Sequence, residues 1–345
     1  MRGVRRLAPY AILAAGLGLL SSCTTPVARA QHGVTPWVDP SPHRVKFVSV
    51  ARGVRLEVLD WGGAGPPLVF LSGLQDVAHG FDEFDARFTD QYHVLAITRR
   101  GYGASSQTRS GYDLATRVAD LHAVLDSLGL RQVALVGHSI AGDELTAFAG
   151  RYPGRVTGLV YLDAAYDHSD IRAALRESPP PPPMRPADSA SATDVQAYLL
   201  RVYGVRIPEA QLRAIGRYNA AGRLVGDVTP GWIDSLMLVG CGHPNYPAVR
   251  APALVIDAVI DSAPQLFPNW ATLDPAGRDA AGHFTLLLQR WARTERARVR
   301  REFPTAQVLE LHGANHYVFF SHPAEVTQAM RAFLARSQTA NGREL

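Results

Sequence analysis

Ser139 stands between an apolar run and a helical pattern, where its hydroxyl could act as a nucleophile. The run Gln132–Val136 is nearly continuous in apolar residues and is typical of a buried strand, and the small residues Gly137 and Ala141 flank the serine. Small neighbours suit a sharp strand-to-helix turn, because the helix can then pack closely on the strand while the hydroxyl projects from the sheet. A serine hydroxyl is a weak nucleophile, so a histidine base is expected elsewhere in the chain.

The segment Val133–Gly142 resembles the nucleophile elbow of the α/β-hydrolase superfamily, with alanine in place of the usual second glycine. Late in the chain, Leu311–His316 resembles the histidine loop of the same superfamily, which follows a strand and precedes the final helix. That match implies that His316 is the catalytic base and that His312 is structural. Relatives that open epoxides or remove halides place an aspartate at the elbow, so Ser139 implies acyl transfer instead.

An imidazole base needs a carboxylate that fixes its tautomer and stabilises its charged form. The segment Pro252–Asp261 resembles the family segment in which the acid lies a short loop beyond a strand, and this alignment selects Asp261. Two alternatives stay open: Asp257, at the expected strand end, and Asp163, which corresponds to an alternative acid position in some family members. The order of serine, aspartate and histidine along the chain is the one expected of this fold.

Attack on a carbonyl creates an oxyanion, which requires preorganised hydrogen-bond donors. The resemblance places one donor at the backbone N–H of Ile140, directly after the nucleophile. Val69–Leu74 resembles the segment that usually reads His-Gly after the third strand, and it implies the N–H of Leu74 as the second donor, with Ser72 replacing the histidine. Further along, Arg99–Ser105 resembles the turn after the fourth strand, which we interpret as scaffold.

The elements that must position these residues alternate between short apolar runs and amphipathic helical patterns. An antiparallel strand pair is expected at 45–50 and 54–59, and helical periodicity is clearest at 114–128 and 326–334. Runs that are apolar throughout suit strands buried on both faces of a parallel sheet. They are Pro67–Leu71, His93–Ile97, Gln132–Val136, Val156–Leu162, Ala253–Ile256 and Gln307–Leu311. The alternation predicts an α/β fold with a doubly wound, mostly parallel sheet.

The predicted α/β-hydrolase core covers residues 45–163 and 250–337, interrupted by a long insertion at 164–249. Such a connection is far longer than a crossover requires, so we interpret it as a helical cap or lid. Its proline run, Pro179–Pro183, is typical of a stiff linker. The remaining predicted parts are helices at 195–203, 209–218 and 232–238, an enlarged connection at 262–301 with a basic helix at 284–301, a linker at 31–44 and a tail at 338–345.

Residues 1–30 have the pattern of an export signal. A basic start precedes an uncharged stretch at 7–20, which is too short to span a bilayer. Two processing sites compete, because Leu20–Cys23 resembles a lipoprotein lipobox and Ala28–Ala30 resembles an ordinary cleavage site. The lipobox is favoured. We therefore expect an exported protein, either periplasmic or tethered to the membrane through lipidated Cys23, and otherwise secreted.

The composition of the chain limits the kinds of partner and cofactor that can be expected. The formal charge of the 345 residues is +4, but the first thirty carry four arginines and no acidic residue, so their removal leaves 31 basic and 31 acidic groups. No nucleic-acid partner is expected from such a balance, and no protein partner is predicted. Two cysteines exclude a disulfide framework. Neither metal-ligand spacing nor a nucleotide-binding glycine fingerprint is evident, so we expect no cofactor and no metal.

Together these patterns predict a serine hydrolase, specifically a carboxylesterase that acts on a small-molecule ester through an acyl-enzyme intermediate. Other reactions on the same triad stay open: amide or peptide hydrolysis, carbon–carbon bond hydrolysis and cofactor-free perhydrolysis. An alternative of a different class is an envelope-associated binding lipoprotein that kept the fold and lost turnover.

Overall fold

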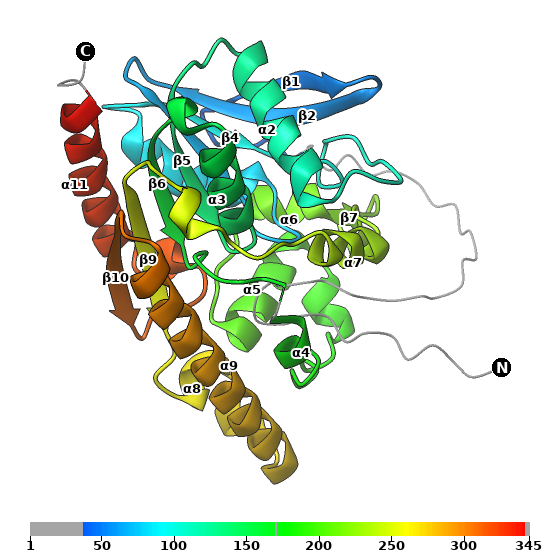
Figure 1. Cartoon of the computed structure of the whole chain (residues 1–345). Coiled ribbons are helices and arrows are strands. Elements are labelled where there is room, and N and C mark those ends of the chain that lie inside the picture. The colour runs from blue at the N-terminus through cyan, green and yellow to red at the C-terminus, as the bar shows by residue number, and fades with distance from the viewer. Residues whose placement is uncertain (1–36, 170, 342–345) are drawn as a thin grey trace.

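A computed structural model describes residues 37–169 and 171–341, which form an eight-stranded sheet with helices on both faces (Figure 1). The strand order is β1-β2-β4-β3-β5-β6-β9-β10, in which β2 is antiparallel to both β1 and β4 and every pair from β4 to β10 is parallel. The strands are β1 (Arg44–Ala51), β2 (Val54–Gly62), β3 (Pro67–Leu71), β4 (His93–Ile97), β5 (Val133–His138), β6 (Val156–Leu162), β9 (Ala253–Val259) and β10 (Ala306–His312). The predicted export signal, with Cys23, lies outside the described residues.

The central strands are buried on both faces, which explains their unbroken apolar sequences. Every residue of β5 and of β9 is buried. The prediction of a mostly parallel, doubly wound sheet is confirmed, and β3, β4 and β6 have the predicted bounds. By contrast, β9 continues to Val259, three residues beyond the predicted end, and this extension takes Asp257 into the strand.

Helices cover the two faces of the sheet with separate apolar layers. On one face, Leu121 and Val124 of α2 and Leu145 and Phe148 of α3 pack against the strands. On the other face, Met330 and Phe333 of α11 join the aromatic side chains that follow β3. Burial of each such side chain contributes roughly 1.5–3 kcal/mol to stability. The helices of the core are α1 (Asp82–Asp85), α2 (Leu114–Ser127), α3 (Ala141–Arg151), α10 (Val318–Ser321) and α11 (Pro323–Asn341), with single 3₁₀ turns at η1 (Ala78–Phe81), η2 (Ala86–Phe88) and η3 (Pro153–Arg155).

The insertion between β6 and β9 is mostly helical and packs beside the carboxyl ends of the strands. Helical periodicity predicted one helix over 209–218, but α6 ends at Ile215, and Gly216–Tyr218 forms β7, which pairs with β8 (Leu224–Asp227). Its remaining elements are α4 (Ile171–Leu175), η4 (Pro186–Ser189), α5 (Ala192–Tyr203), α6 (Glu209–Ile215), α7 (Gly231–Val239) and η5 (Tyr246–Ala248).

The connection from β9 to β10 holds α8 (Ala263–Leu266), η6 (Trp270–Thr272) and the long helix α9 (Pro275–Glu302), which projects past the sheet (Figure 1). α9 begins nine residues before the predicted helix. The Asp274 side chain caps it by accepting a hydrogen bond from the Gly277 N–H at 2.7 Å, and proline fits the first helical position. Within the described ranges, no helix combines the length and apolarity needed to cross a membrane.

Candidate active site

Three strand ends carry left-handed backbone at residues other than glycine. Gln75 follows β3 with φ of 66°, Ser139 follows β5 with φ of 54°, and Asp163 follows β6 with φ of 48°. No other such residue occurs within the described part of the chain. This conformation costs a side-chain-bearing residue on the order of 1–3 kcal/mol and is concentrated at functional sites. All three residues lie at one edge of the sheet, because neighbouring parallel strands end there.

The turn at Ser139 depends on close approach of the backbone on both sides. A Cβ atom on Gly137 would lie 2.8 Å from Leu145 Cδ1, and one on Gly142 would lie 1.8 Å from the carbonyl oxygen of Ala164. The sequence therefore needs glycine at 142, where the neighbouring atom is backbone, and glycine at 137 avoids a contact with a leucine side chain, whereas the methyl group of Ala141 is accommodated. The same approach brings the start of α3 against the loop after β6, since the Ser139 N–H donates to the Leu162 carbonyl at 3.2 Å.

The loop after β10 brings His316 to this turn. The His138 ring, which directly precedes the serine, lies 4.6 Å from the His316 ring between centroids. Its Nε2 donates a hydrogen bond to the His316 carbonyl at 3.2 Å, and burial lowers the pKa of His138 so that its neutral form is favoured. The His316 Nε2 atom is buried and has no hydrogen-bond partner among the described residues. That nitrogen is thus available to a hydroxyl or a substrate.

The carboxylate that holds His316 is Asp163, and the prediction of Asp261 is wrong. Asp163 Oδ2 lies 2.6 Å from His316 Nδ1, and both side chains are buried. Asp261 instead contacts His312 Nδ1 at 2.8 Å from an exposed loop. Both Asp261 oxygens are engaged at the end of β10, by His312 and by the Gly313 N–H at 3.0 Å, so this carboxylate is turned away from His316.

Asp257, the other alternative, does not reach the histidine. It lies within β9, opposite Glu310 of β10, and is 1% exposed. Neither of its carboxylate oxygens has a hydrogen-bond partner in the described structure. Burial, reinforced by the negative charge of Asp163, raises the pKa of Asp257 to about 8. A buried strand residue of this kind cannot orient an imidazole in the loop after β10.

Leu74 and Ile140, the two predicted oxyanion donors, lie in one buried apolar cluster. Neither backbone N–H donates a hydrogen bond within the described structure. The cluster also contains Ile233 and Met237 of α7, so the insertion covers this part of the site. Unused donors beside the serine are what stabilisation of an oxyanion requires.

The loop that carries Leu74 is braced by polar contacts that sequence reasoning did not assign. Arg99 donates to the Gly73 carbonyl at 3.0 Å and to the Ser72 carbonyl, and its Nε pairs with Glu144 at 2.6 Å. Gln75 donates to Asp234 of α7 at 2.6 Å. The turn containing Arg99 was interpreted as scaffold, and what it supports is the backbone of the candidate oxyanion hole.

Tyr166 is a second residue that the sequence did not reveal. Its hydroxyl donates to Asp163 Oδ1, which also accepts from the Ala258 N–H at 2.9 Å. Burial and the nearby carboxylate keep the pKa of Tyr166 well above its usual range, so the phenol remains a donor. The only signal in the sequence is its position three residues after the acid, which by itself has no specific meaning.

An apolar cavity of about 820 Å³, including the part open to solvent, reaches Asp163 and His316. Its walls come from the insertion, from the loop after β9 and from α9, and include Ile171, Tyr203, Leu266, Leu288 and Trp291. A second space of about 1280 Å³ adjoins it, shares Tyr203 and Leu266, and is lined by the run Pro179–Pro183. The proline run therefore forms a wall of this space as well as a connection.

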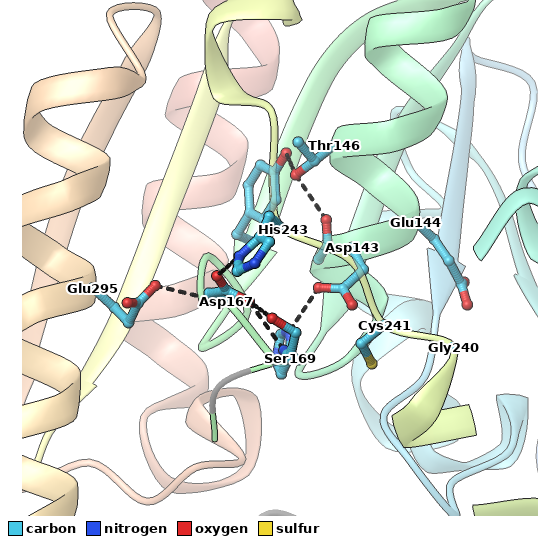
Figure 2. Close-up of polar contacts among 12 residues, drawn as sticks. Asp143, Glu144, Thr146, Asp167, Ser169, Gly240, Cys241, His243 and Glu295 are labelled. Atoms are coloured by element: carbon cyan, nitrogen blue, oxygen red, sulfur yellow. Dashed lines mark hydrogen bonds and ion pairs between the residues drawn. The ribbon is translucent and has the colours of Figure 1, made fainter. Parts of the chain in front are cut away.

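A second polar cluster anchors the chain beyond Asp163 (Figure 2). His168 Nδ1 contacts Asp143 of α3 at 2.7 Å, and both side chains are buried. The Asp167 N–H donates to Glu295 of α9 at 2.8 Å, and its carboxylate contacts His243 at the end of the insertion. The cluster thus joins the loop after β6 to α3, to α9 and to the returning chain, and fixes the direction in which this loop leaves the site.

The sheet order, the strained turn after β5 and the buried His316–Asp163 pair define a protein with α/β-hydrolase architecture. The family profile described as the alpha/beta hydrolase fold matches residues 66–236. The chain belongs to the α/β-hydrolase superfamily.

Individual relatives are similar in sequence to this chain over only part of their length. A non-heme chloroperoxidase from Kitasatospora aureofaciens is 39% identical over 114 residues, which are 32% of this chain and 41% of the relative. A bifunctional esterase/perhydrolase from Acinetobacter calcoaceticus is 32% identical over 115 residues, 31% of this chain and 40% of the relative. These alignments span less than half the length of either relative. The solved structure of E-2-(acetamidomethylene)succinate hydrolase superposes with a TM-score of 0.63 at 20% identity, covering 85% of this chain and 99% of that one. That likeness concerns the fold alone.

Proposed function

We propose that the protein is a serine hydrolase that cleaves carboxylic esters through an acyl-enzyme intermediate. The observation that carries the proposal is the buried Nε2 of His316, which has no partner in the described structure while Nδ1 is held by Asp163 beside the strained Ser139. An imidazole fixed at one nitrogen and free at the other is suited to accept a proton from a neighbouring hydroxyl.

In the proposed reaction, Ser139 Oγ attacks the ester carbonyl while His316 Nε2 takes the hydroxyl proton. Asp163 stabilises the resulting imidazolium, and the N–H groups of Leu74 and Ile140 donate to the oxyanion. Collapse of the tetrahedral intermediate breaks the bond to the alcohol, which leaves with the proton from His316. Water then attacks the acyl-serine and gives a proton to His316, and collapse of the second intermediate returns this proton to Ser139 Oγ and releases the carboxylic acid.

The cavity favours substrates with a sizeable apolar group. Aliphatic and aromatic side chains form most of its wall, and the neighbouring space lined by prolines continues the same character. Burial of apolar surface contributes roughly 25 cal/mol per Å². We therefore expect kcat/KM to rise with the length of the apolar acyl or alcohol group until the two spaces are filled.

The names of the relatives favour one further candidate, perhydrolysis. One relative is named a bifunctional esterase/perhydrolase and others are named non-heme haloperoxidases. On the same acyl-serine, hydrogen peroxide would replace water as the attacking group and release a peroxy acid, with the proton again passing to His316. The two outcomes are distinguished by measuring peroxy acid and carboxylic acid from one ester at increasing peroxide concentration.

The test of the proposed nucleophile combines covalent labelling with ester turnover. A fluorophosphonate probe should label the native chain and the exposed-serine control Ser235→Ala equally, and should not label Ser139→Ala. Hydrolysis of chromogenic esters should likewise be retained in the native chain and in Ser235→Ala and lost in Ser139→Ala. The native chain should hydrolyse esters much faster than the matching amides. Labelling that persists in Ser139→Ala would refute the assigned nucleophile. A native chain that is neither labelled nor active would support the binding-protein alternative.

The sequence of residues 1–30 is the only basis for a cellular location. We propose that the protein is exported and lipidated at Cys23. Replacement of Cys23 by alanine should abolish incorporation of labelled palmitate and block cleavage before residue 23, so that the leader stays attached and the N-terminus changes. If processing occurs after Ala30 instead, the same substitution will leave the mature N-terminus unchanged, and the lipoprotein proposal fails.

A further inference from the structure

Two aspartates and two histidines converge at a place separate from the candidate active site. Asp39 and His43 belong to the segment before β1, and His79 and Asp82 lie in η1 and at the start of α1. One ligand atom from each of the four side chains can be chosen so that all four lie within 4.8 Å of one another. The set joins two parts of the chain that are about forty residues apart in sequence.

The spacing of these atoms fits a tetrahedral cation. His43 Nδ1 lies 3.0 Å from Asp82 Oδ1, and His79 Nδ1 lies 3.2 Å from Asp39 Oδ2 and 3.0 Å from Asp82 Oδ2. His43 Nε2 lies 3.7 Å from the same Asp39 oxygen. Zinc ligands bound at 2.0–2.1 Å in a tetrahedron are separated from one another by about 3.3 Å. His43 can offer only one of its two nitrogens to a single ion, and its Nδ1 also contacts Ser41 Oγ at 2.9 Å, so binding would require rotation of this ring or of a carboxylate.

Two of the carboxylate oxygens have no hydrogen bond, although they are buried. Asp82 has a side chain that is only 6% exposed, yet its Oδ1 accepts no hydrogen bond in the described structure. Asp39 Oδ2 is likewise buried and accepts no hydrogen bond in the described structure. Each oxygen faces a histidine nitrogen, at 3.0 Å and 3.2 Å, without good hydrogen-bond geometry, and coordination of a cation would satisfy the carboxylates and the imidazoles together.

The surroundings hold the four side chains in place. The Ser41 N–H donates to Asp39 Oδ1 at 2.9 Å, which directs Oδ2 of that aspartate toward the histidines. The His43 ring packs edge-on against Trp61 with 5.1 Å between centroids. His79 presents Nε2 to Glu57 Oε1 at 4.0 Å, while its Nδ1 faces the two aspartates.

We propose that Asp39, His43, His79 and Asp82 bind one divalent cation of the zinc type, as a structural clamp. Imidazole and carboxylate ligands suit zinc, and two aspartates balance the charge of a dication. Four protein ligands leave no open position in a tetrahedral site, so the ion ties the segment before β1 to η1 and α1 and takes no part in ester chemistry.

This proposal departs from the expectation that the chain holds no metal. The ligands form two short pairs, Asp39 with His43 and His79 with Asp82, and neither pair has a recognised zinc spacing alone. Only the packing of the segment before β1 against η1 brings the two pairs together. The site is independent of the proposed esterase activity, because none of its residues lines the cavity beside Asp163.

Metal binding is tested on the full chain, prepared without a polyhistidine tag and stripped with a chelator. Titration with Zn²⁺ should give one tight site per chain, and Zn²⁺ should raise Tm by on the order of 5 °C. Co²⁺ in its place should give the intense visible absorption of a tetrahedral ion. A chain that binds no Zn²⁺ stoichiometrically, or whose Tm ignores it, overturns the proposal.

Variants separate the clamp from other histidines. His79→Ala should abolish the cobalt spectrum, and Asp39→Asn, which preserves shape at a partly exposed position, should weaken Zn²⁺ binding by about tenfold or more. His93→Ala is the matched control, because His93 contacts Asp60 at 2.9 Å outside the cluster, and it should bind Zn²⁺ like the native chain. Unchanged binding in both cluster variants, or equal loss in His93→Ala, would show that the ion binds elsewhere.

Discussion

His312 ends β10 and His316 lies in the loop that follows, and each places its Nδ1 against an aspartate. His316 meets Asp163 at 2.6 Å with both side chains at most 9% exposed, whereas His312 meets Asp261 at 2.8 Å with side chains 70% and 47% exposed. The contact distances hardly differ. The surroundings do, because the first pair lies beside the strained turn after β5 and the second lies in solvent.

The comparison shows that an imidazole–carboxylate contact gains its chemical meaning from position. An exposed pair is screened by water and contributes about 0–1 kcal/mol to stability. A buried pair has a stronger electrostatic interaction and a fixed geometry, so that one nitrogen of the ring can be presented to a hydroxyl. We expect the His316–Asp163 pair to control turnover and the His312–Asp261 pair to leave it unaffected.

The largest expected difference is between the two histidines. His316→Ala removes the proposed base and should lower kcat by about 10⁴-fold or more, whereas His312→Ala should change it by less than about twofold. Hydrolysis of a chromogenic ester, with Tm measured in parallel, provides the comparison. Equal losses in the two variants at unchanged Tm would remove the functional distinction between the pairs.

A smaller but still large effect is expected for the two aspartates. Asp163→Asn keeps the size of the side chain but disturbs the tautomer of His316, and should lower kcat by roughly 10³–10⁴-fold. Asp261→Asn should leave kcat within about twofold of the native value. The reverse ranking in the same ester assay would restore Asp261 as the acid and would imply that the loop after β9 rearranges in solution.

These two pairs also show which parts of the site could be predicted from the sequence and which could not. Ser139, His316 and the parallel strands could be predicted because each leaves a local pattern, either small residues around a turn or an unbroken apolar run. The choice between Asp163 and Asp261 could not, because both aspartates follow strands. It depends on how the loops after β6, β9 and β10 pack together, which no local pattern records.

The insertion illustrates the same limit in the fold. The periodicity of residues 209–218 was helical throughout, yet the chain becomes β7 at Gly216 because a partner strand, β8, is available. Pairing within this short hairpin outweighs the weak preference of three residues. Tyr166 was missed because its partner is supplied by the folded structure, whereas Arg99 was interpreted as scaffold without its partners being named.

Tyr166 provides a finer test of the buried pair. Tyr166→Phe removes one of the hydrogen bonds to Asp163 while preserving the ring that lines the cavity, and should lower kcat by about tenfold with little change in KM. Tyr161→Phe is the matched control, because Tyr161 is equally buried but its hydroxyl contacts Thr146 at 3.0 Å, on the other face of the sheet. A loss that is equal in the two variants would point to general destabilisation.

The smallest expected effect is on stability. It concerns Asp257, which is buried without a hydrogen bond, in contrast to the paired Asp163. Asp257 accepts no hydrogen bond among the described residues, and its pKa is raised to about 8 from an ordinary value near 3.8. Between those two pH values the folded state keeps a proton that the unfolded chain has released. The free energy of unfolding therefore falls as pH rises through this window.

Asp257→Asn mimics the protonated form at every pH, so its stability relative to the native chain should increase with pH. We expect near-equal free energies of unfolding at pH 4, and a gain of at least about 1 kcal/mol for the variant at pH 8, by denaturant titration. Asp261→Asn, in an exposed pair, should show no such trend. If the advantage of Asp257→Asn is the same at both pH values, Asp257 is ionised throughout the range and its isolation in β9 has no electrostatic consequence.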